Sequence, residues 1–109
     1  MANDLKLAER ILKILPLTIH FAEKRMFGGI GYLVNGNMAC GVHGDNLIVR
    51  VGVEIYERAL KQPFTRPFDL TGKPMKGWLY VEPAGLQDDS ELKKWVEEGI
   101  KFALSLPKK

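Results

Sequence analysis

The dipeptide Asn35-Gly36 constrains the fold of this chain more than any other feature of its sequence. A two-residue type I′ turn needs a positive φ angle at both central positions, and Asn followed by Gly is the pair that adopts it most readily. Gly44-Asp45 stands where the next tight turn of a meander would fall. Apolar residues alternate with others on both sides of these turns, as is typical of strands. We therefore predict three antiparallel strands, at Met26–Val34, Asn37–His43 and Asn46–Val51.

Two-residue turns would also fix the pairing of these strands, with Leu33 opposite Met38, Tyr32 opposite Ala39 and Cys40 opposite Val49. Since successive side chains point to opposite faces of a sheet, this register predicts one apolar face that packs against helices. That face would carry Phe27, Leu33, Met38, Cys40, Val42, Leu47, Val49 and Val51. The other face is mixed and at least half hydrated, with Ile30, Tyr32, Asn37, His43, Asn46, Ile48 and Arg50.

Helical periodicity marks three further segments of the chain. Apolar residues recur every three or four positions in Asp4–Leu15, Val53–Lys61 and Ser90–Leu106. A short strand is expected at Pro67–Leu70 and a clear one at Trp78–Val81, which is rich in aromatic and β-branched residues. The order α-β-β-β-α-β-β-α predicts an α+β fold: an antiparallel sheet of four to five strands with helices mainly on one face. The 109 residues have room for one hydrophobic core, so residues 1–109 are read as a single domain.

The residue types present exclude several classes of function. A single cysteine, Cys40, allows no internal disulfide, which suits a reducing cytoplasm. Cys40 and His43 would point to opposite faces of their strand, and His20 is the only other histidine, so we expect no metal site. The two serines do not lie on a strand-to-helix elbow, and no acid–base pair is evident, so we expect neither an enzyme nor a cofactor. The uncharged stretch 26–44 is broken by Asn and Gly residues, so no membrane span is expected.

The chain carries a formal net charge of +3, which permits nucleic-acid binding without requiring it. Basic residues gather in the segment 58–76, where Phe64 and Phe68 are interleaved with them. Basic side chains contact phosphates and aromatic rings stack on bases, so this segment is a candidate nucleic-acid surface. A solvated connector whose aromatic rings fill the core is the alternative. The candidate nucleic-acid-binding residues are Lys24, Arg25, Arg66, Lys73 and Lys76.

The mixed face of the sheet is a second candidate surface. Ile30, Tyr32, Ile48 and Arg50 would lie there together, and we expect the three helices to leave part of this face uncovered. Such a face would suit a protein partner or a second copy of the chain as a homodimer. The alternative is a face that is simply hydrated, as is common in antiparallel sheets.

Four segments of the chain together resemble a known family. They are Lys24–Gly31, Asn35–Ala39, Asp45–Gly52 and Thr71–Trp78. Their residues are similar to those of the N-terminal domain of the TfoX/Sxy family, over roughly His20 to Leu106. The resemblance implies a bacterial α+β domain with a topology like that of secretion chaperones. It also implies a link to competence regulation, because full-length relatives regulate natural competence at promoters alongside the cyclic-AMP receptor protein. Those relatives carry a second, helical C-terminal domain, so this chain is expected to be a stand-alone N-terminal domain. The family supplies no catalytic residues.

Three functions follow as expectations, given in the order of the support that the sequence offers. The first is a non-enzymatic regulatory or adaptor domain that binds a protein partner and is linked to transcription or competence regulation. The second is a nucleic-acid-binding module that uses the segment 58–76. The third is a small-ligand binder or an enzyme of unknown reaction.

Overall fold

The computed structural model of the chain describes residues 5–15, 21–26, 28–69, 72 and 75–107. It has three α-helices, one 3-10 helix and a six-stranded sheet. In chain order the elements are α1 (Leu5–Ile14), β1 (Phe21–Met26), β2 (Gly29–Val34), β3 (Asn37–His43), β4 (Asn46–Arg50), α2 (Tyr56–Leu60), β5 (Thr65–Pro67), β6 (Trp78–Val81), η1 (Pro83–Leu86) and α3 (Asp89–Ser105). The predicted α+β class and order are confirmed, with one strand more than expected.

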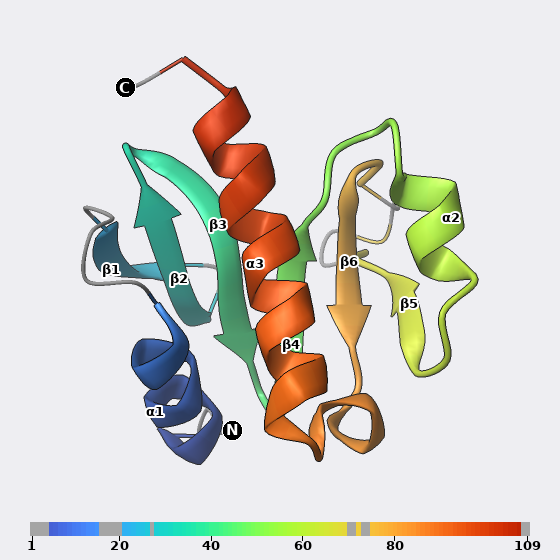
Figure 1. Ribbon diagram of the computed structural model, residues 1–109, viewed down its shortest axis with the longest axis horizontal. Helices are drawn as coiled ribbons and strands as arrows, with labels where there is room; N and C mark the ends of the chain where they lie inside the picture. The colour runs from blue at the N-terminus through green and yellow to red at the C-terminus, as the bar shows by residue number, and fades with distance from the viewer. Residues whose placement is uncertain (1–4, 16–20, 27, 70–71, 73–74, 108–109) are drawn as a thin grey trace.

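The strands lie in the order β1-β2-β3-β4-β6-β5, and every neighbouring pair is antiparallel. Helices α1 and α3 lie across one face of the sheet, and α2 lies beside β6 and β5 at the far edge (Figure 1). The Asn35-Gly36 turn forms as predicted, with φ angles of 53° and 82°. It joins β2 to β3 directly, so the local turn signal determined the centre of the sheet.

The additional strand is β1, whose six residues pair with β2 from Phe21 opposite Val34 to Met26 opposite Gly29. The sequence pattern did not reveal it because Glu23, Lys24 and Arg25 are consecutive charged residues, which hide the alternation of a strand. Charged side chains are common on edge strands, where they discourage pairing with other chains. β1 is such an edge strand.

A β-bulge in β3 changes the predicted register. Leu33 lies opposite Met38 as expected, but Tyr32 lies opposite Cys40 instead of Ala39. Ala39 is thus an extra residue on β3, and two neighbouring residues of this strand share one face. A slip of one residue sends every side chain beyond it to the other face of the sheet.

The bulge therefore exchanges residues between the two faces. Ile30 and Tyr32 lie in the main core beneath the helices, together with Cys40, whereas Leu33 and Met38 lie in the smaller cluster on the opposite face. The expected placement of Ile30, Tyr32, Leu33 and Met38 was wrong for this reason. Beyond the bulge on β3 and along β4, the predicted helix-facing residues are confirmed in the main core: Cys40, Val42, Leu47 and Val49. Phe27 lies outside the described residues.

Helix α3 approaches the sheet closely at Gly99, which faces the bulge. A Cβ atom on Gly99 would overlap the carbonyl oxygen of Ala39 and lie 2.9 Å from its carbonyl carbon. The helix backbone therefore rests almost directly on the strand backbone. The buried residues of α3 follow the predicted stripe: Leu92, Val96, Gly99, Ile100 and Ala103.

Two polar side chains, Arg10 and Asn37, join distant parts of the chain to the ends of α3. Arg10 on α1 donates to the carboxylate of Asp89 at 3.0 Å and to the carbonyl oxygen of Leu86 at 2.6 Å. The buried side chain of Asn37 donates from Nδ2 to the carbonyl oxygen of Pro107 at 3.0 Å. Both ends of α3 are thereby joined to the rest of the fold.

Candidate functional site

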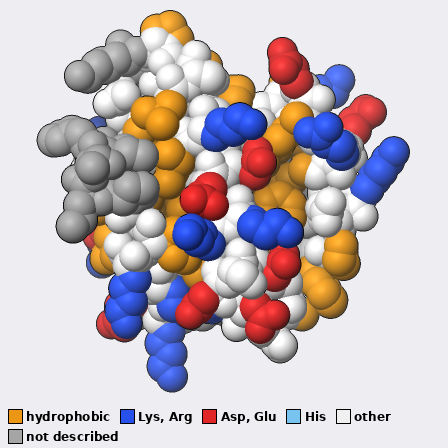
Figure 2. Space-filling view, in the orientation of Figure 1, with side chains coloured by type: hydrophobic (Ala, Val, Ile, Leu, Met, Phe, Trp, Pro, Cys, Tyr) orange, Lys and Arg blue, Asp and Glu red, His pale blue; other side chains and the backbone are white. Residues whose placement is uncertain are grey.

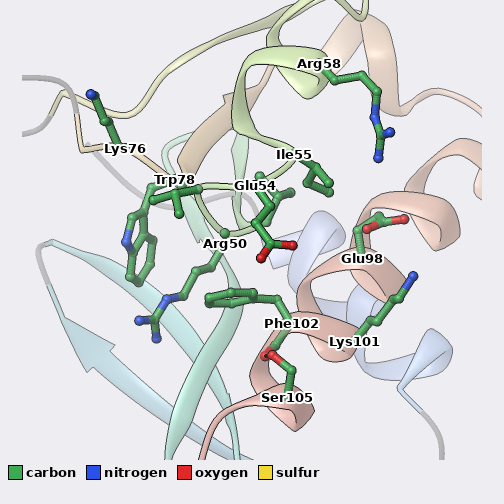
Figure 3. A pocket seen from close by; sticks show the side chains of 14 residues that line it. Arg50, Glu54, Ile55, Arg58, Lys76, Trp78, Glu98, Lys101, Phe102 and Ser105 are labelled. Atoms are coloured by element: carbon green, nitrogen blue, oxygen red, sulfur yellow. Dashed lines mark hydrogen bonds between the residues drawn. The ribbon is translucent and has the colours of Figure 1, made fainter.

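A cleft of about 540 Å³ lies where β4 ends and β6 begins, beside α3. Three segments that are far apart in the chain line it, namely residues 50–58, 76–78 and 98–105 (Figure 3). We call it the Arg50 cleft. Pockets for small groups commonly measure about 300–1,000 Å³, so the size suits a ligand or a side chain of a partner.

Arg50 is held between two aromatic rings in this cleft. It is the last residue of β4 and pairs with Trp78 on β6. Its guanidinium carbon lies 5.0 Å from the ring centroid of Trp78 and 5.1 Å from that of Phe102, within the range of cation–π attraction. Burial lowers the pKa of Arg50, but an arginine starts so high that it stays charged at neutral pH. No described residue accepts a hydrogen bond from this guanidinium or forms an ion pair with it.

Two glycines make this arrangement sterically accessible. Gly52 and Gly77 have φ angles of 87° and 93°, in the left-handed region that favours glycine. The N–H groups of Val51 and Gly52 both donate to the carbonyl oxygen of Gly77, at 2.8 and 3.1 Å. A Cβ on Gly52 would overlap the ring of Phe102, so the missing side chain is what lets Phe102 reach Arg50.

The charges around the cleft favour an anion. Four cations line it, and two carboxylates accompany them. Lys76 and Trp78 lie on the side of Arg50, whereas Arg58, Glu98 and Lys101 lie on the opposite side (Figure 3). The described residues show no ion pair among these charges. The excess of positive charge is therefore available to an anionic group.

The residues predicted to bind nucleic acid do not form one surface. Lys76 lines the Arg50 cleft, but Arg66 lies on β5, 4.4 Å above the ring centroid of Tyr80. Lys24 and Arg25 are on β1 at the opposite edge of the sheet and, as neighbours on a strand, point to opposite faces. Lys73 lies outside the described residues.

The residues predicted to form a protein interface do not share a face either. Ile30 and Tyr32 are buried beneath the helices because of the bulge. Ile48 is on the opposite face and is fully buried in the cluster that contains Phe68. Of the four, only Arg50 is partly exposed, and it belongs to the cleft.

Several residues of the cleft were missed at the level of sequence. Trp78, Lys101 and Phe102 carry no local motif, and Phe102 reads as part of the apolar stripe of its helix, whereas Arg58 was included in the basic segment 58–76. The single local hint was the pair of glycines, Gly52 and Gly77, in segments without a predicted hairpin. Only the tertiary fold brings these residues together.

The cleft is equipped for binding. The one hydroxyl group among its lining residues, on Ser105, donates to the carbonyl oxygen of Phe102 at 2.6 Å. Within the described part of the chain, no three His, Cys, Asp or Glu residues are grouped so that they could hold a metal ion. An arginine guanidinium is planar and presents parallel N–H donors, which match the two oxygens of a carboxylate or a phosphate. The arrangement therefore suits recognition of an anionic oxygen group.

Comparison with known proteins identifies a family. The family model for the TfoX N-terminal domain matches residues 18–103. Neither the curated proteins nor the solved structures contain a match. In the ranges that the structure describes, no helix is both long enough and apolar enough to cross a membrane. Since the match covers most of the sequence, the chain belongs to the TfoX N-terminal domain family.

Proposed function

We propose that this chain is a non-enzymatic regulatory or adaptor domain that binds an acidic group of a protein partner in the Arg50 cleft. The observation that carries the proposal is the guanidinium of Arg50, which lies between Trp78 and Phe102 with no acceptor among the described residues. The family is associated with competence and regulatory proteins and is not a known enzyme family, which supports a regulatory role.

The stacking of Arg50 favours binding in two ways. The aromatic rings restrict the side chain before a ligand arrives, so less conformational entropy is lost when its donors are used. Partial burial weakens competition from water, and hydrogen bonds between charged partners are roughly twice as strong as neutral ones. The donors of Arg50 thus offer the cleft a specific contact, while Lys76, Arg58 and Lys101 add attraction of longer range.

The test is a titration of the ¹⁵N-labelled protein with a short blocked peptide of alanine and glutamate, followed by NMR. The amides of Gly52 and Gly77 and the indole N–H of Trp78 should shift, because they line the cleft. The matching glutamine peptide should leave them unchanged. Arg50→Met should abolish the shifts, whereas Lys93→Met, at an exposed position of α3 outside the cleft, should keep them. Equal shifts in wild type and Arg50→Met would show that the cleft does not recognise the acid.

Nucleic-acid binding is the second candidate, favoured by the positive excess around the cleft. Of the two rings expected to stack on bases, Phe64 is 47% exposed, but Phe68 is only 3% exposed and packs against Tyr80, which leaves Phe68 unsuited to stacking. Binding of single- and double-stranded oligonucleotides at rising salt tests this function. If phosphates are contacted, Arg66→Ala and Lys76→Ala should each reduce the salt slope by about one unit. Absence of binding at low salt would remove this candidate.

A further inference from the structure

The Arg50 cleft continues into a groove between α2 and α3. A second hollow of about 330 Å³ shares Ile55, Arg58 and Glu98 with the cleft. Its floor is apolar and includes Ile55, Ala59 and Trp95. Trp95 is half-buried and borders this hollow. Figure 2 shows hydrophobic side chains in the hollow between α3 and α2, with charged side chains of both signs around it. We call it the α2/α3 groove.

The groove exists because α2 and α3 pack on different strands. The five-residue helix α2 contacts β5 and β6, whereas α3 lies over β2, β3 and β4. The apolar side chains between the two helices are therefore only partly covered. A third hollow, which shares Trp95 with the groove, is bordered by Phe64, whose side chain is 47% exposed. Contiguous exposed apolar surface with a polar rim is typical of protein-binding sites.

The two ends of this continuous surface differ in charge. The Arg50 cleft has four cations and two carboxylates along its walls. The lining of the α2/α3 groove has three glutamates, Glu91, Glu97 and Glu98, against Arg58 and Lys94, and Lys94 lies 3.7 Å from Glu91. An acidic group is therefore attracted at the Arg50 end and repelled near Trp95, where the floor accepts an apolar side chain.

We propose that one extended segment of the protein partner occupies both sites, with an acidic residue in the Arg50 cleft and an apolar residue against Trp95. This inference rests on the proposed function. Phe102 and Trp95 are seven residues apart on α3, which corresponds to about 10 Å along the helix axis. In the polyproline II conformation, residues three apart lie on the same side and about 9 Å from each other. The partner segment thus carries its acid and its apolar anchor three positions apart.

The experiment is a selection of random linear 12-residue peptides, displayed on phage, against the wild-type protein. Enriched peptides should share an acidic and an apolar residue at a three-residue separation. Synthetic peptides with a separation of two or five should bind at least tenfold more weakly. The chain has two tryptophans, one in each site, so their indole N–H signals report both contacts in the unaltered protein. A selected peptide should shift both signals.

Variants separate this inference from the proposed function. Arg50→Met should weaken a selected peptide at least tenfold, and Lys93→Met should not. Trp95→Leu, which keeps an apolar side chain in the groove, should weaken it severalfold while leaving the shift of Trp78 in place. Peptides that need Arg50 but shift only Trp78 and show no fixed apolar position would overturn the two-site segment and leave the acid-binding function intact. Peptides indifferent to Arg50→Met, or a failure to enrich any peptide, would overturn both.

Discussion

Replacing Gly99 with alanine should destabilise the protein, although alanine is the better helix former. The new Cβ would overlap the carbonyl oxygen of Ala39 and lie 2.9 Å from its carbonyl carbon. A backbone carbonyl cannot rotate away as a side chain can, so α3 must move outward, and the contacts of Leu92, Val96 and Ile100 with the sheet must loosen. Overpacking of this kind costs about 1–3 kcal/mol. Because backbone meets backbone, we take about 3 kcal/mol from that range and subtract about 1 kcal/mol gained in helix propensity.

The expected result is a net loss of about 2 kcal/mol, which corresponds to a decrease in melting temperature of about 8 °C for a domain of this size. Urea unfolding followed by circular dichroism measures the loss. Lys93→Ala, at an exposed position of the same helix, is the control and should stay within about 0.5 kcal/mol of wild type. Adding Ala39→Gly should not rescue Gly99→Ala, because the obstacle is the carbonyl group and not the side chain. A Gly99→Ala protein as stable as wild type, or more so, would refute the close approach of helix and strand.

Two further predictions concern buried groups of the sheet. Burial raises the pKa of the Cys40 thiol to about 12, so the folded state holds this proton more tightly than the unfolded chain, whose cysteine pKa is about 8.5. The free energy of unfolding should therefore decrease from about pH 8.5 upward, and this group contributes at most about 1.4 kcal/mol per pH unit to the decrease. Urea unfolding at several pH values measures it for wild type and for Cys40→Ala. If the free energy of unfolding depends on pH in the same way in both proteins, the burial of Cys40 is contradicted. Ile48→Glu should unfold the protein, because Ile48 is fully buried and a glutamate there would be an unpaired buried charge. The control is Val53→Glu, at a side chain that is 69% exposed, and it should melt at the same temperature as wild type. Circular dichroism of the two variants decides, and a natively folded Ile48→Glu protein would be evidence against the second core cluster.

The parts of the fold that could be predicted are those set by local physics. The Asn35-Gly36 turn needs only its own two residues, and the pairings of Cys40 with Val49 and of Leu33 with Met38 follow from turn length alone. Helix α3 follows from the period of its apolar residues and was predicted to within one residue at each end. These features require no knowledge of distant contacts.

The bulge at Ala39 could not be predicted because its cause lies far away in the chain. The alternation of apolar residues is equally regular on both sides of it, and a small alanine fits either face of a strand. In the fold, Ala39 lies under Gly99, sixty positions later, where a larger residue on either element would separate helix from sheet. The two faces of β2 were consequently exchanged in the prediction.

The Arg50 cleft could not be predicted from the sequence for a similar reason. Arg50 and Lys76 were singled out, but as members of two separate surfaces. Their neighbours Trp78 and Phe102 are ordinary apolar residues in sequence and acquire a role only when the ends of β4 and β6 meet α3. Sequence patterns report burial along one element, whereas a cleft depends on the distances between elements.

The strand order also divides the sheet into two units, each built from strands that follow one another in the chain. The meander β1–β4 carries α3, the hairpin β5–β6 carries α2, and the two units meet along the pairing of β4 with β6 (Figure 1). Arg50 opposite Trp78 is the last residue pair between β4 and β6, so the cleft lies at the end of this pairing. Lys76 belongs to one unit and Phe102 to the other. A ligand that contacts both units would hold them together at this end of the β4–β6 pairing, and its binding free energy would add to the free energy needed to separate them.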